Sequence, residues 1–161
     1  YKLVIFDAWR DIDTQQALFD RMQSFVQRDH PEFNADQTLA ATLRIVALPS
    51  SNANRPSPHN TGGSVDVSIV DERGRLLEMG SPFDDISARA KTTYYEFEPE
   101  SEDVIKIREN RRLLYHVMTN AGFTNYLEEW WHYDYGNQNW AFMSGHDTAF
   151  YGATKPEFPW L

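Results

Sequence analysis

The first strongly patterned stretch of the chain, residues 3–6, is a continuous apolar run of Leu, Val, Ile and Phe. A short uninterrupted run of branched and aromatic residues is typical of a buried strand. Between positions 18 and 26, apolar residues recur at spacings of one, three and four, which predicts a helix with one apolar face. Asp13 or Thr14 can cap this helix, and Pro31 lies just beyond its expected end.

The middle of the chain combines predicted strands with a long polar loop. Polar residues 32–38 are expected to connect the helix to a strand over residues 42–48, which are rich in branched apolar side chains. Residues 49–58 contain serine, asparagine and three prolines without any hydrophobic period, so they are expected to form a loop. Long loops inside a compact domain are often functional.

A strand with two distinct faces is expected over residues 64–70. Branched apolar residues alternate there with polar ones, so Asp66 is predicted to lie on the face opposite the apolar side chains. The Asp-Glu-Arg-Gly sequence at 71–74 predicts a hairpin turn, followed by a returning strand over 75–79.

The second half of the chain carries one long predicted helix. Residues 80–99 are expected to form a long loop or lid, after which Ser101 caps a helix that Gly122 terminates. Beyond this helix we expect short strands at 123–127 and 133–135, a turn at 136–139, a returning strand at 140–142, and a segment from 144 to 161 that wraps the domain.

Composition is typical of a globular protein and disfavours two classes of partner. The 161 residues, 41% of them hydrophobic, suit a single domain spanning residues 1–161. A net charge of −9 disfavours binding to nucleic acid, so Arg108, Arg111 and Arg112 are interpreted as part of a solvated helix face. The sequence contains no run of about 18 apolar residues, so no membrane span is predicted.

The absence of cysteine narrows the possible chemistry. It excludes disulfides, cysteine zinc sites and a cysteine nucleophile, and leaves His, Asp and Glu as the ligand pool.

No signal peptide is recognisable, which favours the cytoplasm, with the periplasm as the alternative. The sequence opens without Met inside an apolar stretch, which is consistent with removal of a preceding segment.

Candidate catalytic chemistry lies in two separate stretches. His59 and Asp66 in the first, with His132 in the second, form a set of three ligands that leaves a fourth position on zinc for water. Glu129, three residues before His132, is a candidate general base. The separation of seven between His59 and Asp66 would aim them at opposite faces of a straight strand, but the Asn-Thr-Gly-Gly turn lets His59 approach from a loop.

Each stretch also has a purely structural explanation. A lone His-x6-Asp is more often part of an ordinary loop, and a lone Glu-x-x-His beside two tryptophans is more often an aromatic core element. Arg10 follows the first predicted strand, where loops commonly carry function. It fits equally well as a surface arginine paired with Asp7 or Asp11.

Taken together, these motifs resemble those of a known family. Ser57-x-His59-x6-Asp66 followed by Glu129-Trp-Trp-His132 is similar to the zinc D-alanyl-D-alanine dipeptidases of the vancomycin-resistance type, peptidase family M15. The resemblance extends to Asp7-Ala8-Trp9-Arg10 and to the Met-Gly-Ser-Pro-Phe-Asp sequence at 79–84, and it spans almost the whole chain.

The resemblance implies a fold and a role for each motif residue. The fold would be α+β, a small antiparallel sheet packed against helices in a Hedgehog/DD-peptidase-like zinc domain. One Zn²⁺ per chain would be bound by His59, Asp66 and His132, with Glu129 as general base and Arg10 stabilising the tetrahedral intermediate. Asp84 matches the residue that binds the ammonium group of the dipeptide, and Ser57 matches a serine near its carboxylate.

The sequence departs from the family pattern in two places. The family arginine is normally followed by proline, whereas Asp11 follows Arg10 here. Family members also have an N-terminal segment that contributes to a small, closed pocket. This chain is expected to begin after that segment, so an N-terminal segment or a partner chain is expected to complete the pocket. The alternatives are a peptidoglycan D,D- or L,D-carboxypeptidase or endopeptidase of the same fold, and a Hedgehog-like zinc module that binds a partner without catalysis.

Overall fold

The computed structural model describes residues 1–50 and 52–157 and has the expected α+β architecture. Its antiparallel sheet has the strand order β1-β2-β4-β3. The strands are β1 (Lys2–Asp7), β2 (Ser64–Val70), β3 (Thr124–Asn125) and β4 (His132–Asp134). The helices are α1 (Ile12–Asp29), α2 (Ala35–Thr42), α3 (Glu102–Asn120) and α4 (Gln138–Ser144), with short 3₁₀ turns η1 (Pro58–Thr61), η2 (Ala88–Ala90) and η3 (Tyr94–Glu96).

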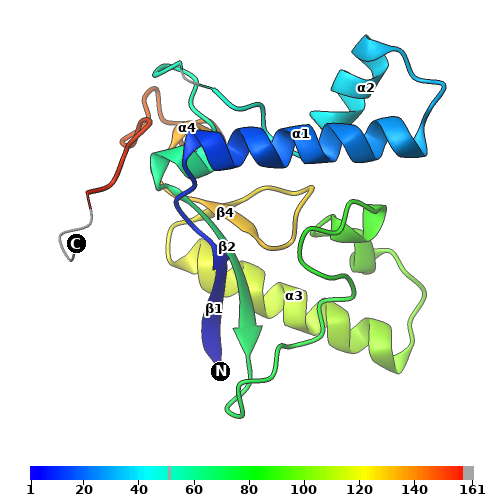
Figure 1. The fold of residues 1–161 in the computed structure, drawn as a ribbon. Coiled ribbons are helices and arrows are strands. Elements are labelled where there is room, and N and C mark those ends of the chain that lie inside the picture. The colour runs from blue at the N-terminus through cyan, green and yellow to red at the C-terminus, as the bar shows by residue number, and fades with distance from the viewer. Residues whose placement is uncertain (51, 158–161) are drawn as a thin grey trace.

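The helices take two different positions relative to the sheet. Figure 1 shows α1 crossing near the end of β1, with α2 folded back against it, while α3 lies along the sheet. The core lies between the sheet, α3 and the tryptophan pair before β4, and it is built from Val67, Ile69, Leu114, Met118, Trp130, Trp131 and Tyr133. None of the helices within the described residues has both the length and the apolar character needed to cross a bilayer.

The two long helices predicted from the sequence are confirmed. The first begins two or three residues earlier than expected, because Asp11 rather than Asp13 or Thr14 is its cap and accepts a hydrogen bond from the Thr14 amide. The cap of α3 is Ser101, as predicted. Its end at Gly122 is also confirmed, since this residue has a φ of 92°, a conformation that glycine adopts without steric cost.

The strand expected over residues 42–48 is wrong. Residues 35–42 form the helix α2 instead, and turns follow it. The sequence signal was an Asn-x-x-Gln capping box: the Asn34 side chain accepts from the Gln37 amide, and the Gln37 side chain accepts from the Asn34 amide. These reciprocal bonds satisfy two backbone amides that would otherwise lack partners. They begin a helix within residues 32–38, which were expected to form a polar connection.

The returning strand expected over residues 140–142 is also wrong. These residues lie in α4, because the side chain of Asn137 accepts a hydrogen bond from the Trp140 amide and caps a helix. The return over 75–79 is reduced to an isolated bridge between Val70 and Leu76. Of the predicted wrapping segment, residues 158–161 lie outside the described part of the chain.

Arg111 contradicts the expectation of a solvated helix face. Only 3% of it is exposed. Its guanidinium donates to the backbone carbonyls of Met79 at 2.7 Å, Lys91 at 2.6 Å and Arg89 at 2.7 Å. Burial lowers the pKa of Arg111 to about 10, which leaves the group charged at neutral pH. Arg111 therefore anchors both ends of the loop that carries Asp84.

Candidate active site

The three predicted metal ligands converge at one buried point. Nε2 of His59 lies 3.2 Å from Nδ1 of His132 and 3.4 Å from Oδ2 of Asp66. His132 Nδ1 lies 3.0 Å from Oδ1 of Asp66. One potential ligand atom from each residue falls within 4.8 Å of the others, and all three residues are buried. Two imidazole nitrogens and a carboxylate oxygen suit zinc, so the donor set fits the metal that the sequence predicts.

Strand register brings Asp66 and His132 together. The two residues are direct partners across the antiparallel β2–β4 pair, so their side chains leave the same face of the sheet. A β-bulge between Ile5 and Asp7 also places Asp7 opposite Asp66, on the other side of β2. Bulges are common beside active sites because they redirect side chains. The centre of the site is therefore built on the sheet.

The glycine turn delivers His59 from outside the sheet, as the sequence predicts. His59 lies in η1, which Gly62 ends in the left-handed conformation with a φ of 71°. At Gly63, a Cβ atom would lie 2.6 Å from the carbonyl oxygen of Tyr135, so the close backbone approach at this position requires glycine. The Tyr135 amide donates to the Gly63 carbonyl at 2.7 Å, which ties the turn to the end of β4.

Hydrogen bonds on the outer ring nitrogens orient both histidines. His59 Nδ1 lies 2.7 Å from the Ala8 carbonyl oxygen, which can only accept, so Nδ1 carries the proton and Nε2 is free to bind metal. His132 has the opposite arrangement, with Nε2 at 3.2 Å from Oδ1 of Asp134 and Nδ1 facing the site. Metal-binding histidines are commonly held in this way.

Sequence reasoning missed Asp134. Its carboxylate is 2% exposed and accepts hydrogen bonds from Ser64 Oγ at 2.6 Å and Asn137 Nδ2 at 2.6 Å, in addition to contacting His132. A signal was present, because residues two apart on a strand share a face, and the His-x-Asp spacing therefore points Asp134 towards His132. The carboxylate holds the imidazole in the tautomer that a metal needs.

Replacing Asp134 with Ala is expected to lower zinc affinity by roughly 10–100-fold, because His132 loses the acceptor that orients its ring. Competition with a chromophoric zinc chelator would measure the affinity, and circular dichroism would check folding. Asp134→Asn, which keeps an oxygen acceptor, should retain most of the affinity. Equal affinity in Asp134→Ala and the unaltered protein would show that Asp134 does not orient the ligand.

Electrostatics in the cluster favour a cation. Burial raises the pKa of Asp66, but hydrogen bonds from His132 and His59 outweigh it and hold that pKa well below its usual range. Burial likewise lowers the pKa of His132, but hydrogen bonds to Asp134 and Asp66 outweigh it and raise that pKa well above the ordinary value. Without a metal, a proton on His132 therefore neutralises part of the negative charge that a bound cation would neutralise.

Glu129 lies at the edge of the same cluster. Its Oε2 is 3.9 Å from His132 Nδ1, because a turn before β4 joins the two residues through a bond from the His132 amide to the Glu129 carbonyl. Asn125 holds this turn by donating to the same carbonyl at 3.2 Å. Burial, with the Asp66 and Asp84 carboxylates, outweighs the charge of His132 and raises the pKa of Glu129 to about 7.

Arg10 is both paired with a carboxylate and placed in the wall of the cavity. Its guanidinium bonds to Asp7 and donates to Oε1 of Gln15 at 2.8 Å, so it is indeed paired with Asp7. It also lines the cavity, with Nη2 at 3.9 Å from Oδ2 of Asp66. Gln15 was missed by sequence reasoning, although a buried polar residue on the apolar face of a helix was the available signal. Asp7 and Gln15 hold Arg10 beside the three predicted metal ligands His59, Asp66 and His132, which we call the metal-ligand cluster.

Asp84 and Ser57 lie in different surroundings. Asp84 lines the cavity from the loop that Arg111 anchors, and it has a φ of 60°, which aspartate tolerates better than most residues. Burial and the Asp66 carboxylate raise its pKa. Ser57 is buried, and its hydroxyl donates to the Leu48 carbonyl at 2.9 Å. Unlike the other six predicted site residues, Ser57 is not part of the cavity lining.

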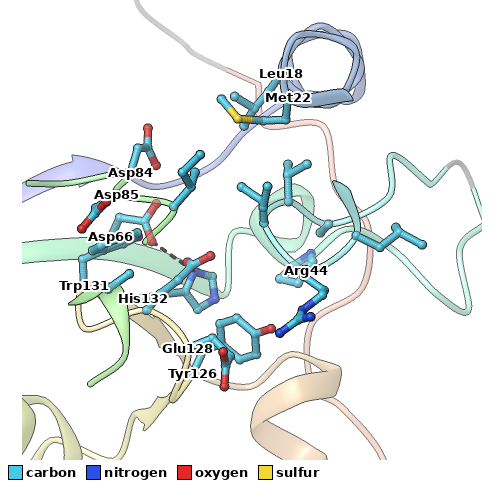
Figure 2. Close-up of a pocket in the computed structure, with 18 of the residues that line it drawn as sticks. Leu18, Met22, Arg44, Asp66, Asp84, Asp85, Tyr126, Glu128, Trp131 and His132 are labelled. Carbon is cyan, nitrogen blue, oxygen red and sulfur yellow. Dashed lines mark hydrogen bonds and ion pairs between the residues drawn. The ribbon is translucent and has the colours of Figure 1, made fainter. Parts of the chain in front are cut away.

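The cavity has a volume of about 630 Å³ and extends well beyond the metal-ligand cluster. Figure 2 shows its walls: Asp84 and Asp85 lie on one side of the Asp66–His132 pair, and Arg44, Tyr126 and Glu128 lie on the other. Leu18 and Met22 of α1 form an apolar part of the wall. This volume falls in the range of small-molecule binding sites.

Comparisons with known proteins agree with the geometry. A family model described as D-Ala-D-Ala dipeptidase, peptidase M15, matches residues 1–154. A D-alanyl-D-alanine dipeptidase of Synechocystis sp. is 33% identical over 156 residues, which cover 89% of this chain and 63% of the relative. One from Escherichia coli is 28% identical over 133 residues, covering 83% and 54%. One from Enterococcus faecium is 33% identical over 103 residues, covering 62% and 44%.

The matched part of the chain spans 63% of the length of the Synechocystis relative and 54% of the Escherichia coli relative. The family match, in contrast, includes every residue of the metal-ligand cluster as well as Arg10, Glu129 and Asp84. On this match, the chain belongs to the D-Ala-D-Ala dipeptidase family of peptidases, M15.

Proposed function

We propose that this protein hydrolyses the dipeptide D-Ala-D-Ala in a zinc-dependent reaction. The observation that carries the proposal is the convergence of a three-residue ligand set, a carboxyl group with a raised pKa and an arginine on one cavity. A site that only binds a partner requires neither a general base nor an arginine beside the metal-binding residues. The relatives' names, D-alanyl-D-alanine dipeptidase, support the choice of substrate.

The metal would be held by His59, Asp66 and His132. Zinc bound by three protein ligands polarises a carbonyl group and lowers the pKa of water to about 7. Glu129, at the edge of the cluster, would accept the proton of the attacking water and then pass it to the departing amine. Arg10, held by Asp7 and Gln15, would stabilise the negative charge that develops on the carbonyl oxygen.

The two charged ends of the dipeptide need partners within the same cavity. We assign the ammonium group to Asp84, whose carboxylate lines the wall beside the cluster. We also propose Ser57 as a contact for the carboxylate, although it is buried and does not line the cavity. To serve in that role its hydroxyl would have to exchange its bond to the Leu48 carbonyl for one to the substrate.

Replacing Asp84 with Asn is expected to raise KM for free D-Ala-D-Ala by about tenfold or more, since a hydrogen bond between charged groups is lost. KM for an N-acylated dipeptide should change little. Asp85→Asn is the matched control, because Ser87 already bonds to that carboxylate through its amide and its hydroxyl. Equal effects of Asp84→Asn on both substrates would contradict an ammonium-binding role.

The proposal is tested by release of D-Ala from D-Ala-D-Ala by zinc-loaded protein, beside an N-acylated D-Ala-D-Ala peptide. Cleavage of the free dipeptide, lost on chelation and restored by zinc, is the expected result. No cleavage of either substrate by protein with one zinc bound would reject hydrolysis and favour a binding module.

The size of the cavity favours one second candidate, a peptidoglycan carboxypeptidase or endopeptidase of the same fold. A volume of about 630 Å³ is typical of sites for ligands larger than a dipeptide. Preferred cleavage of the N-acylated peptide in the same assay would establish this candidate in place of the dipeptidase.

A further inference from the structure

Arg44 is a cation in the cavity wall that the proposed chemistry does not use. It follows α2, where its amide bonds to the Ala41 carbonyl at 3.2 Å and the Val46 amide bonds to the Thr42 carbonyl at 3.0 Å. These bonds form ordered turns, so the backbone presents Arg44 at a defined position. Figure 2 shows its side chain extending towards Tyr126 on the cavity wall.

The other cationic side chains of the wall already have partners. Arg10 bonds to Asp7 and Gln15, and Nζ of Lys91 lies 2.9 Å from Oε2 of Glu128. Within residues 1–50 and 52–157, the guanidinium of Arg44 has no hydrogen bond or ion pair. It is also exposed. Its five donors are therefore available to a ligand.

Acidic and basic side chains lie on different sides of the metal-ligand cluster. Asp84 and Asp85 lie on one side of the Asp66–His132 pair in Figure 2, and Arg44 lies on the other, together with Glu128, whose carboxylate is already paired with Lys91. A free dipeptide has the same arrangement, with its ammonium and carboxylate groups on opposite sides of the peptide carbonyl. A substrate with that carbonyl at the cluster and its ammonium towards Asp84 would extend its carboxylate towards Arg44.

We propose that Arg44 binds the substrate α-carboxylate and makes the site selective for peptides with a free C-terminus. The planar guanidinium can donate two parallel hydrogen bonds to a carboxylate, an arrangement that a lysine or a hydroxyl cannot reproduce. The inference rests on the proposed function for the location of the scissile bond. It adds a residue for the carboxylate at a position outside the motif stretches.

The test compares D-Ala-D-Ala with D-Ala-D-alaninamide, which lacks the terminal charge, using zinc-loaded protein. Arg44→Gln is expected to raise KM for the free dipeptide by about tenfold or more, with kcat little changed. Kinetics on the amide should be unchanged. Arg44→Lys keeps the charge but not the paired donors, so its KM for the free dipeptide should lie between those of the unaltered protein and Arg44→Gln. Arg73→Gln, at an exposed arginine in the turn after β2, is the matched control.

Calorimetric titration separates this inference from the proposed function. D-Ala-D-Ala is titrated into zinc-loaded Glu129→Gln, with and without Arg44→Gln, so binding is measured without turnover. Weaker binding in the double variant supports the role of Arg44 even if the unaltered protein cleaves nothing. Unchanged binding, or an equal loss for dipeptide and amide in the kinetic assay, rejects it while leaving hydrolysis intact. Absence of dipeptide binding in both variants rejects it as well.

Discussion

Glu129→Gln is expected to lower kcat by roughly 10²–10⁴-fold, the usual contribution of a general base. Glutamine has nearly the same shape as glutamate but cannot take a proton from water. Because Glu129 is not among the three proposed ligands, the variant should bind zinc with a stoichiometry of one, as the unaltered protein does. Steady-state kinetics and metal analysis on the same sample would measure both quantities.

Glu128→Gln is the matched control for this variant. The neighbouring glutamate also lines the cavity, but it is paired with Lys91 and lies outside the metal-ligand cluster. Its replacement should leave kcat within a few-fold of the original value. Full activity of Glu129→Gln would remove Glu129 as the base.

The pH dependence provides a second test of Glu129. A general base acts in its unprotonated form, so kcat/KM should fall as the pH drops through its pKa. Burial raises that pKa to about 7 in the metal-free protein, and a bound dication would lower it again. The acid limb of the profile is therefore expected at or below pH 7. It should be absent from the residual activity of Glu129→Gln.

His132→Ala is expected to weaken zinc binding on the order of a hundredfold or more. Structural zinc sites bind with about 10–16 kcal/mol from four ligands, so one ligand accounts for roughly 3 kcal/mol, which corresponds to about a hundredfold. The change also removes the hydrogen-bond partner that Asp66 and Asp134 share. Activity at limiting zinc should fall together with affinity, which a competing chelator would measure.

His116→Ala controls for loss of a histidine as such, since His116 is exposed on α3. It should bind zinc like the unaltered protein, whereas unchanged zinc binding in His132→Ala would exclude His132 from the ligand set. Zinc affinity of the unaltered protein should also decrease as the pH falls. Because the pKa of His132 is raised in the metal-free protein, the metal must displace a proton from this imidazole, and the protonated fraction grows as the pH falls.

The site illustrates how spacing in the sequence and position in the structure complement each other. The motif residues His59, Asp66, His132 and Glu129 were predicted from their types and order, because two imidazoles and a carboxylate can bind a catalytic zinc ion and a further carboxylate can act as general base. Their convergence depended on contacts that spacing does not specify. Asp66 meets His132 only through the β2–β4 register, and His59 reaches them from η1.

The long helices α1 and α3 and the strand β2 could be predicted from the sequence alone, because their hydrophobic periods and caps are local properties. The residue types of the proposed metal-ligand cluster could be predicted in the same way. The tertiary structure was needed to show that residues 42–48 are not a strand, that Arg111 is buried, and that Asp134 contacts His132. It also placed Arg44 in the wall of the cavity. These features depend on backbone carbonyls, strand partners and packing supplied by segments distant in the chain, so no local pattern of residue types contains them.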